Sequence, residues 1–423
     1  MNILIKDIPA ITHAGAETIS VYISGNKIAS IGSMPDGFKA DKTIIGTGKL
    51  LIPGLINAHT HAAMTLFRNS ADDLLFNDWL FSRIFPLEAQ LQSDDVYWGV
   101  LLAVMEMLKS GTTTFLDMYF FTESYVKAIN ESGMRCVYSR GLLRNSPADE
   151  SKLKEYFEEI NRFKGNDKLS FMLAPHAPYT CDEGFQREIA QEAKRLNLGI
   201  HTHISESLAE NKTIAEQYGC TPAELFDKNG LLTSRTVAAH CVHLSDSDID
   251  LLAARGVHVA TNPVSNLKLA NGVAPVPKLL SAGINVALGT DGAASNNTLN
   301  MFRELTMLTL IHKGVSQDAQ AVTAKQGFEM ATKNGAAALG ISDIGEIQAG
   351  KKADLVILNV DSPNMQPLNN PVSALAYSTN GSETECVIVD GEVLYENGEY
   401  PTIDKERVLY EISKICERIG TNK

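Results

Sequence analysis

Strand-like and helical segments alternate through the middle of the 423-residue chain, and this pattern predicts an α/β protein built on a (β/α)8 TIM barrel. Both ends of the chain instead contain short alternating segments, which predict a small β-sandwich domain assembled from the two termini. A doubly wound open sheet is the main rival, but no G-x-G-x-x-G motif follows an early strand. We therefore expect a barrel over residues 53–344, and a composite β domain with a C-terminal helix over residues 1–52 and 345–423.

The two ends of the chain have the period-two pattern of strands, interrupted by Gly and Asp. Near the N-terminus these segments are ISVYISGNKIASIGS (19–33) and KTIIGTGKLL (42–51). Near the C-terminus they are ADLVILNVD (353–361) and ECVIVDGEVLYENGEY (385–400). Asp390-Gly391 within the last segment predicts a tight hairpin turn.

The barrel prediction depends on eight short apolar runs, each separated from the next by a helical stretch. The eight runs, in chain order, are GLINAHTH (54–61), TTTFLDM (112–118), RCVYSRGLL (135–143), LSFMLAPHA (169–177), LGIHTHIS (198–205), TVAAHCVHL (236–244), VHVATNP (257–263) and INVALGTDG (284–292).

Composition narrows the classes of protein and partner. A net charge of −13 argues against nucleic-acid binding, because binding phosphate requires clustered Lys and Arg. The six cysteines are scattered without a C-x-x-C pair, which argues against both a disulfide framework and a zinc ribbon. No apolar run is long enough to span a bilayer, and the N-terminus reads as a strand rather than a signal peptide. We expect a soluble, cytoplasmic protein that binds neither nucleic acid nor membrane.

Histidines and acidic residues gather near the ends of the candidate strands. Active sites of barrels lie at the carboxyl ends of the strands, so these residues are expected to converge. Seven of the ten histidines are among them, and this clustering predicts a metal-dependent hydrolase. From the first, fourth, fifth, sixth and eighth runs, the residues are His59 and His61; His176; His201, His203 and Glu206; His240 and His243; and Asp291.

Spacing alone leaves several assignments open. His59 and His61 share one face of their strand, because side chains two positions apart point the same way. The same rule applies to His201 and His203, of which one is expected to be a ligand and the other a supporting residue.

The remaining candidates each have a structural alternative. His176 could be a hydrogen-bonded core residue, and either His240 or His243 could be the functional member of its pair. Asp291 could cap the following helix, although a carboxylate beside imidazoles also suits a divalent cation.

Four motifs, PGLINAHTH, HISE, AAHCVHL and GTDGAASNN, resemble the metal motifs of the amidohydrolase superfamily. They are most similar to its 5-methylthioadenosine/S-adenosylhomocysteine deaminase family, over nearly the whole chain. The resemblance implies one divalent metal ion, usually zinc, held by four ligands. It leaves His201 in a supporting place, and the absence of a lysine at the end of the fourth strand favours a single ion. The ligands that it implies are His59, His61, His203 and Asp291.

The resemblance also implies roles in catalysis. Asp291 and His240 are expected to hold the attacking water and accept its proton, and Glu206 is expected to donate a proton to the ring and then to the leaving amine. Outside this context, Glu206 would read as a solvated residue in the first turn of a helix. The expected reaction converts the adenine ring of 5'-methylthioadenosine or S-adenosylhomocysteine, or adenosine, to hypoxanthine with release of ammonia.

Substrate contacts are expected from several segments. Residues 62–92 are too long for a plain barrel connection and predict a lid. By resemblance, Glu88 accepts hydrogen bonds from the ribose hydroxyls, His176 contacts the purine or the sugar, and Arg140 binds the amino-acid carboxylate of S-adenosylhomocysteine. Arg144 is expected to form a surface salt bridge instead.

Alternatives at the level of function also remain at this point. Trp79 and residues 118–121 can wall the pocket or simply form core. A sister aminohydrolase acting on guanine, cytosine or a triazine would share most of the motifs, and a barrel that has lost catalysis is a more distant alternative. The expected partner is a small purine nucleoside, and family members are often homo-oligomers.

Overall fold

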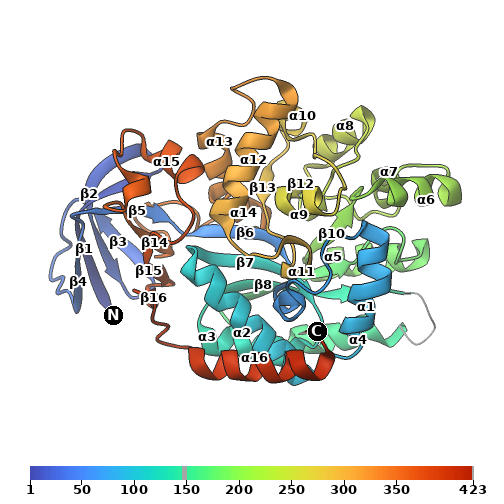
Figure 1. Cartoon of the computed structure of the whole chain (residues 1–423), viewed down its shortest axis with the longest axis horizontal. Coiled ribbons are helices and arrows are strands. Elements are labelled where there is room, and N and C mark those ends of the chain that lie inside the picture. The colour runs from blue at the N-terminus through green and yellow to red at the C-terminus, as the bar shows by residue number, and fades with distance from the viewer. Residues whose placement is uncertain (145–149, 422–423) are drawn as a thin grey trace.

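The computed structural model of the protein describes residues 1–144 and 150–421 (Figure 1). Its strands form two eight-stranded sheets, one in the middle of the chain and one built from both termini. Within the described residues, no helix has the length and apolar character that crossing a membrane requires.

The middle of the chain forms a nearly closed parallel barrel in the order β13-β12-β11-β10-β9-β8-β7-β6, which confirms the predicted fold class. All residues of β6, β7, β10 and β11 are buried, because the barrel interior covers one face and helices cover the other. The eight strands, each within one of the predicted runs or one residue beyond it, are β6 (Leu55–Thr60), β7 (Thr112–Tyr119), β8 (Arg135–Leu142), β9 (Leu169–Pro175), β10 (Gly199–Ile204), β11 (Thr236–His240), β12 (His258–Thr261) and β13 (Val286–Leu288).

The first and last barrel strands meet at a seam. The backbone N–H of Asp291 donates to the His59 carbonyl oxygen (3.0 Å), and the backbone N–H of Thr290 donates to Asn57 Oδ1 (3.0 Å). Gly289 makes this approach possible, because a Cβ there would lie 2.9 Å from the backbone N and O of His59. The seam therefore brings the end of β13 against the end of β6.

Helices surround the barrel and bury one stripe each. In α5, Phe185, Gln186, Ile189 and Ala193 are buried at the three-to-four-residue spacing of a helix face, and Asp182 Oδ1 accepts the Phe185 N–H at the start. The helices of the barrel region are α2 (Ser93–Lys109), α3 (Thr122–Ser132), α4 (Glu150–Phe163), α5 (Glu183–Leu196), α6 (Leu208–Tyr218), α7 (Pro222–Lys228), α8 (Asp246–Arg255), α9 (Pro263–Lys268), α10 (Val276–Ser281), α11 (Ala293–Asn296), α12 (Met301–Ser316), α13 (Ala324–Met330) and α14 (Lys333–Ala338).

The segment expected to be a lid consists of short helical turns between β6 and α2. These are η1 (Ala62–Phe67), the π-helical η2 (Asp78–Ile84) and α1 (Phe85–Glu88). Trp79, Leu80 and Ile84 of η2 are buried, so this segment packs onto the barrel rather than extending into solvent.

The two ends of the chain form one mixed sheet in the order β16-β15-β14-β5-β1-β2-β3, with β4 paired to β1. Its apolar residues form their own core, drawn almost entirely from the sheet, so the sheet curls around itself as a sandwich does. Asp390 and Gly391 both have positive φ (53° and 77°), as the predicted turn requires. The strands are β1 (Asn2–Thr12), β2 (Gly15–Ser24), β3 (Lys27–Ile31), β4 (Lys42–Ile45), β5 (Lys49–Pro53), β14 (Leu355–Asn359), β15 (Thr384–Val389) and β16 (Glu392–Glu396).

The last part of the chain returns from the sheet to the barrel. After η4 (Pro363–Met365), α15 (Pro371–Tyr377) and β16, helix α16 (Lys405–Ile419) runs alongside α2 (Figure 1). Arg418 of α16 donates to the Gln90 carbonyl oxygen (3.2 Å) and pairs with Asp95. The predicted domain boundaries remain a proposal, and α16 lies against the barrel.

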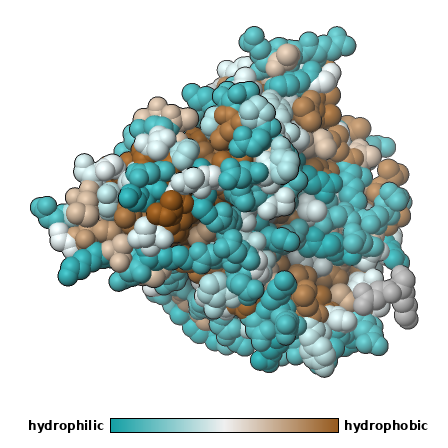
Figure 2. All heavy atoms as spheres, turned by 60° about the vertical axis from the view of Figure 1, so that its left-hand side comes forward, coloured by the Kyte–Doolittle hydropathy of each residue, from teal (hydrophilic) through white to brown (hydrophobic). Residues whose placement is uncertain are grey.

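Viewed with the small sheet turned forward, the surface is mostly hydrophilic with scattered apolar patches (Figure 2).

Candidate active site

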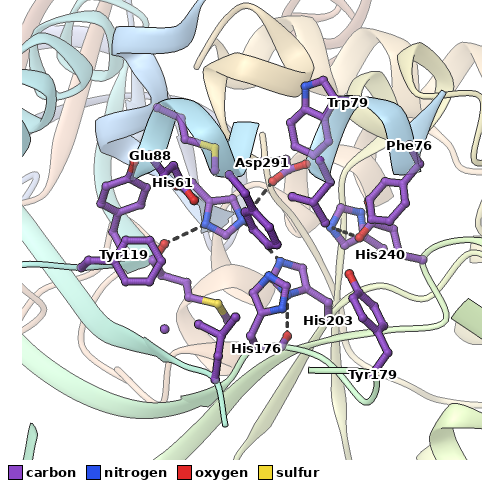
Figure 3. Close-up of a pocket in the computed structure, with 18 residues that line it drawn as sticks. His61, Phe76, Trp79, Glu88, Tyr119, His176, Tyr179, His203, His240 and Asp291 are labelled. Atoms are coloured by element: carbon purple, nitrogen blue, oxygen red, sulfur yellow. Dashed lines mark hydrogen bonds and ion pairs between the residues drawn. The ribbon is translucent and has the colours of Figure 1, made fainter. Parts of the chain in front are cut away.

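A cavity of about 600 Å³, counting the part open to solvent, lies at the carboxyl ends of the barrel strands (Figure 3). One side is polar and comes mainly from the strand ends; its residues are His61, His176, His203, Glu206, His240 and Asp291. The other side is largely apolar and comes partly from the lid segment, which contributes Met64, Phe76, Trp79, Leu80, Phe85 and Glu88. The site therefore joins a group of titratable residues to an apolar chamber.

Four side chains come together through short distances at their tips. Asp291 Oδ1 lies 3.4 Å from His59 Nε2 and 3.3 Å from His61 Nε2. His61 Nε2 in turn lies 3.3 Å from His203 Nε2. The ring nitrogens of His59, His203 and His240 also lie within 4.8 Å of one another. The structure thus brings together all four predicted ligands and His240.

Hydrogen bonds on the far side of three of these rings fix where their protons lie. His61 Nδ1 is 2.7 Å from the Met118 carbonyl oxygen, and His203 Nδ1 is 2.6 Å from the His176 carbonyl oxygen. His240 Nδ1 is 2.8 Å from Asn266 Oδ1. An oxygen of this kind only accepts, so each Nδ1 carries the proton and each Nε2 keeps its lone pair. The lone pairs converge on one point.

This arrangement fits a tetrahedral divalent cation. Zinc–ligand bonds of about 2.0–2.1 Å place the donor atoms of a tetrahedral site about 3.3 Å apart. The separations from Asp291 Oδ1 to His59 Nε2 and His61 Nε2, and from His61 Nε2 to His203 Nε2, are 3.3–3.4 Å. Moreover, His59 Nε2 is buried and has no hydrogen-bond partner among the described residues. Imidazole and carboxylate donors are a usual ligand set for zinc.

The Asp291 carboxylate is oriented toward the imidazoles and does not cap the helix that follows. Its Oδ2 accepts hydrogen bonds from Ser265 Oγ (2.5 Å) and Ser295 Oγ (2.8 Å), which leaves Oδ1 facing the imidazoles. No side-chain hydrogen bond caps the following helix, α11, so the capping alternative is not observed. Asp291 has a φ of 59°, a conformation that costs a non-glycine residue energy and that often occurs at functional sites. The neighbouring imidazoles hold the pKa of Asp291 well below its usual value, against the effect of burial.

Glu206 lies beside this group and is not a solvated helix residue. Asn271 Nδ2 donates to Glu206 Oε1 (3.1 Å), and Glu206 Oε2 lies 3.7 Å from His240 Nε2. Burial raises the pKa of Glu206 well above its usual value, and the negative charge of Asp291 adds to the shift. A carboxyl group whose pKa is raised in this way is suited to donate a proton.

The other histidines of the strand ends take separate places. His201 is fully buried behind the cluster, with its Nε2 2.7 Å from His59 Nδ1. His176 lines the cavity, and its Nδ1 is 3.0 Å from Thr180 Oγ1. Burial lowers the pKa of His176 to about 3, so the ring is neutral. His243 is absent from the cavity wall, which leaves His240 as the member of that pair at the site.

Glu88 reaches the cavity from the lid segment. Its Oε1 and the hydroxyl of Tyr119 are both buried, and neither has a hydrogen-bond partner among the described residues. Figure 3 shows the two side chains next to each other on the cavity wall. Burial raises the pKa of Glu88 to about 7, while interaction with Tyr119 acts in the opposite direction. Buried polar atoms without partners are rare, and here they face space that a polar ligand can fill.

The structure corrects the expectation for Arg140. Residues alternate across a strand, and on β8 Ser139 points into the barrel, so Arg140 points outward. Its guanidinium lies 3.2 Å from Glu159 and 3.4 Å from Glu155 of α4, and it is not part of the cavity wall. Arg144 pairs with Asp182 (2.9 Å) and Glu188 (3.2 Å), as expected of a surface salt bridge.

Several functional candidates had no clear signal in the sequence. Ser265, Asn266 and Asn271 lie in or just after α9, and polar residues in such segments are too common to single out. Ser295 lies four residues after Asp291, within the GTDGAASNN motif, and nothing in the motif singles it out. Of the aromatic candidates, Trp79, Tyr119 and Phe120 wall the cavity, as does Met118; Phe121 is 41% exposed.

The chain is similar to known proteins over most of its length. Residues 50–394 match the model of the amidohydrolase family. A 5-methylthioadenosine/S-adenosylhomocysteine deaminase of Caldanaerobacter subterraneus subsp. tengcongensis is 47% identical over 427 residues, which cover 99% of each chain. A 5'-deoxyadenosine deaminase of Methanothermobacter thermautotrophicus is 45% identical over 412 residues, or 96% of each chain. The crystal structure of an adenosine deaminase from Xanthomonas campestris with bound zinc has a TM-score of 0.95 and 33% identity, and covers 99% of both chains. The family match spans the whole barrel and part of the small sheet, and the chain belongs to the amidohydrolase family.

Proposed function

We propose that the protein is a zinc-dependent deaminase that hydrolyses the adenine ring of 5'-methylthioadenosine and S-adenosylhomocysteine to hypoxanthine, with release of ammonia. One observation carries the proposal: imidazole nitrogens and the Asp291 carboxylate come together next to the buried Glu206 carboxyl group, whose pKa is raised, at the polar end of a cavity. The substrate class follows the names of the similar deaminases, which include one for 5'-deoxyadenosine.

In this proposal one zinc ion is held by His59, His61, His203 and Asp291. Such an ion lowers the pKa of water, so that a nucleophile is available at neutral pH. A bridging lysine at the end of β9 would favour a second ion, but Lys168 lies before that strand and pairs with Glu392 of the small sheet (2.8 Å). His176 follows β9 at the cavity end.

The side chains at the site supply the proton transfers. Asp291 Oδ1 accepts a proton from the attacking water, and His240 Nε2 orients that water toward C6 of the adenine ring. Glu206 donates its proton to the adjacent ring nitrogen, which relieves the negative charge that develops there as the new C–O bond forms. The proton that Asp291 accepted passes to the exocyclic amine, which leaves as ammonia when the C–N bond breaks. The proton of the new C6 hydroxyl group passes to Glu206 as the carbonyl of hypoxanthine forms, which restores the Glu206 carboxyl group.

Recognition of the nucleoside is proposed for the opposite side of the cavity. Glu88 Oε1 and the Tyr119 hydroxyl have no hydrogen-bond partner in the part of the chain that the structure describes, and both can bond to the two ribose hydroxyls. His176 contacts the purine or the sugar between the two ends of the site. The apolar surface of the lid segment, including Phe76 and Phe85, covers the rest of the ligand.

A substrate screen combined with metal analysis tests the proposal. The panel contains 5'-methylthioadenosine, S-adenosylhomocysteine, 5'-deoxyadenosine, adenosine, guanine and cytosine, with ammonia release and the adenine-to-hypoxanthine absorbance change as readouts. We expect one zinc per chain and the highest kcat/KM for a 5'-thio-adenosine. A higher kcat/KM for a free base, or activity that does not depend on a metal, would contradict the proposal.

The proposal also includes the cellular compartment, the partners and the oligomeric state of the protein. All six cysteines are free thiols, which suits the reducing cytoplasm, and the net charge of −13 disfavours a nucleic-acid partner. A homo-oligomer is proposed by resemblance to the family and is tested by light scattering coupled to size-exclusion chromatography.

A further inference from the structure

His59 differs from the other imidazoles of the site in what holds its Nδ1. The rings of His61, His203 and His240 each face an oxygen that only accepts a hydrogen bond. His59 Nδ1 instead faces His201 Nε2 at 2.7 Å. A ring nitrogen is either a donor or an acceptor, depending on the tautomer, so this contact alone does not determine which nitrogen of His59 carries the proton.

The next contact favours one of the two tautomers. His201 Nδ1 lies 2.9 Å from Ser139 Oγ, and the Ser139 hydroxyl donates to the Asp117 carbonyl oxygen at 2.6 Å. A hydroxyl has one proton, so Ser139 Oγ accepts from His201 Nδ1–H. His201 Nε2 then has a lone pair and accepts from His59 Nδ1–H. As a result, His59 Nε2 is unprotonated and faces Asp291 Oδ1.

The opposite arrangement is also self-consistent, and it would block the site. If Ser139 donated to His201 Nδ1, then His201 Nε2–H would donate to His59 Nδ1. His59 Nε2–H would then donate to Asp291 Oδ1, so that neither atom could bind a cation. The shorter distance from Ser139 Oγ to the Asp117 oxygen, 2.6 Å against 2.9 Å to His201, favours the first arrangement.

Water cannot substitute for any member of this chain. Ser139, His59 and His201 all have 0% exposure, so each proton position depends on a protein partner. The three residues come from β8, β6 and β10, and their side chains meet inside the barrel. We infer that Ser139 and His201 are positioning residues that fix the tautomer of His59 and so prepare its Nε2 to bind the zinc of the proposed function.

Zinc affinity tests the inference on the full chain. Ser139→Ala removes the acceptor of His201 Nδ1–H, and we expect zinc affinity, measured by chelator competition, to fall about 10- to 100-fold. Ser139→Thr keeps a hydroxyl and is expected to restore most of the affinity. Ser132→Ala is the matched control, because Ser132 is also fully buried and its hydroxyl also donates to a backbone carbonyl oxygen, that of Ile129. Equal zinc affinity in Ser139→Ala and Ser132→Ala would overturn the inference.

A second measurement reads the tautomer in the wild-type chain itself. In the metal-free chain labelled with ¹⁵N-histidine, long-range ¹H–¹⁵N spectra distinguish the two tautomers of His59, whose signals are assigned from those lost in His59→Gln. We expect a proton on Nδ1 and none on Nε2. A proton on Nε2 of His59 in the wild-type chain would overturn the inference. Neither readout requires turnover, so the inference can fail while the proposed substrate class stands, and the reverse also holds.

Discussion

Replacing Glu206 with Gln tests the proposed proton donor while leaving the shape of the site unchanged. A glutamine side chain has nearly the size of a protonated carboxyl group, and its Oε1 can still accept the hydrogen bond from Asn271 Nδ2, which is 3.1 Å long in the structure. Glu206 is not one of the proposed zinc ligands. We therefore expect Glu206→Gln to keep its zinc and to bind nucleoside with nearly unchanged KM.

The expected loss is in kcat. An amide cannot give up a proton at neutral pH, whereas burial and the charge of Asp291 raise the pKa of the Glu206 carboxyl group and so favour the form that can donate one. General acid–base catalysis contributes about 10²- to 10⁴-fold, or about 3 to 5 kcal/mol of transition-state stabilisation. We expect kcat for 5'-methylthioadenosine to fall within that range.

The assay measures ammonia release and zinc content on the same preparation. Glu159→Gln is the matched control, since it removes a carboxylate that pairs with Arg140 on the outside of the barrel. A Glu206→Gln enzyme with full zinc and a kcat within tenfold of the wild type would refute the acid role. A loss of kcat that parallels a loss of zinc would also refute it, because the effect would then come from the metal site.

Three further predictions concern other parts of the site. Asp291→Ala removes the carboxylate that lies 3.3–3.4 Å from two imidazole nitrogens, and it should lose zinc during dialysis against a chelator that leaves the wild type loaded, as measured by metal analysis. Glu88→Gln should raise KM for nucleosides about 10-fold or more but leave KM for a 2',3'-dideoxy analogue unchanged, because a carboxylate accepts hydrogen bonds from both hydroxyls. Because burial raises the pKa of Glu88 to about 7, the carboxylate is lost as pH falls through that value. The KM of the wild type for nucleosides should therefore rise below about pH 7. The same rise should be absent in Glu88→Gln. Arg140→Ala should change KM for S-adenosylhomocysteine less than twofold, because the guanidinium pairs with Glu159 outside the barrel; a KM increase confined to this substrate would show that Arg140 reaches it.

The barrel and the convergence at its end could be read from the sequence because both follow from short-range patterns. Alternation places His59 and His61 on one face of β6, and the parallel sheet brings the ends of distant strands together. The choice between His201 and His203 could not be made in this way, since both point into the barrel. The choice depends on which ring reaches the group of proposed ligands at the cavity. His203 Nε2 reaches His61 Nε2, whereas His201 contacts the far side of the His59 ring.

Side chains alternate between the two faces of a strand. This alternation placed His59 and His61 correctly, and it also explains why Arg140 lies outside the cavity. Ser139 and Arg140 are neighbours on β8, so only one of them can point into the barrel, and the sequence gives no sign which one does. Ser265 and Asn271, which follow β12, contact Asp291 and Glu206. Contacts of this kind arise from tertiary packing and leave no periodic pattern in the chain.

The barrel seam sets when during synthesis the protein can take up its ion. Thr60 Oγ1 donates to the Asp291 carbonyl oxygen across a sequence separation of 231 residues. A ribosome adding about 5–20 residues per second needs roughly 10 to 50 seconds to make that length of polypeptide. During that interval His59 and His61 exist without their carboxylate partner, so the proposed set of four ligands is complete only after the eighth strand has been made.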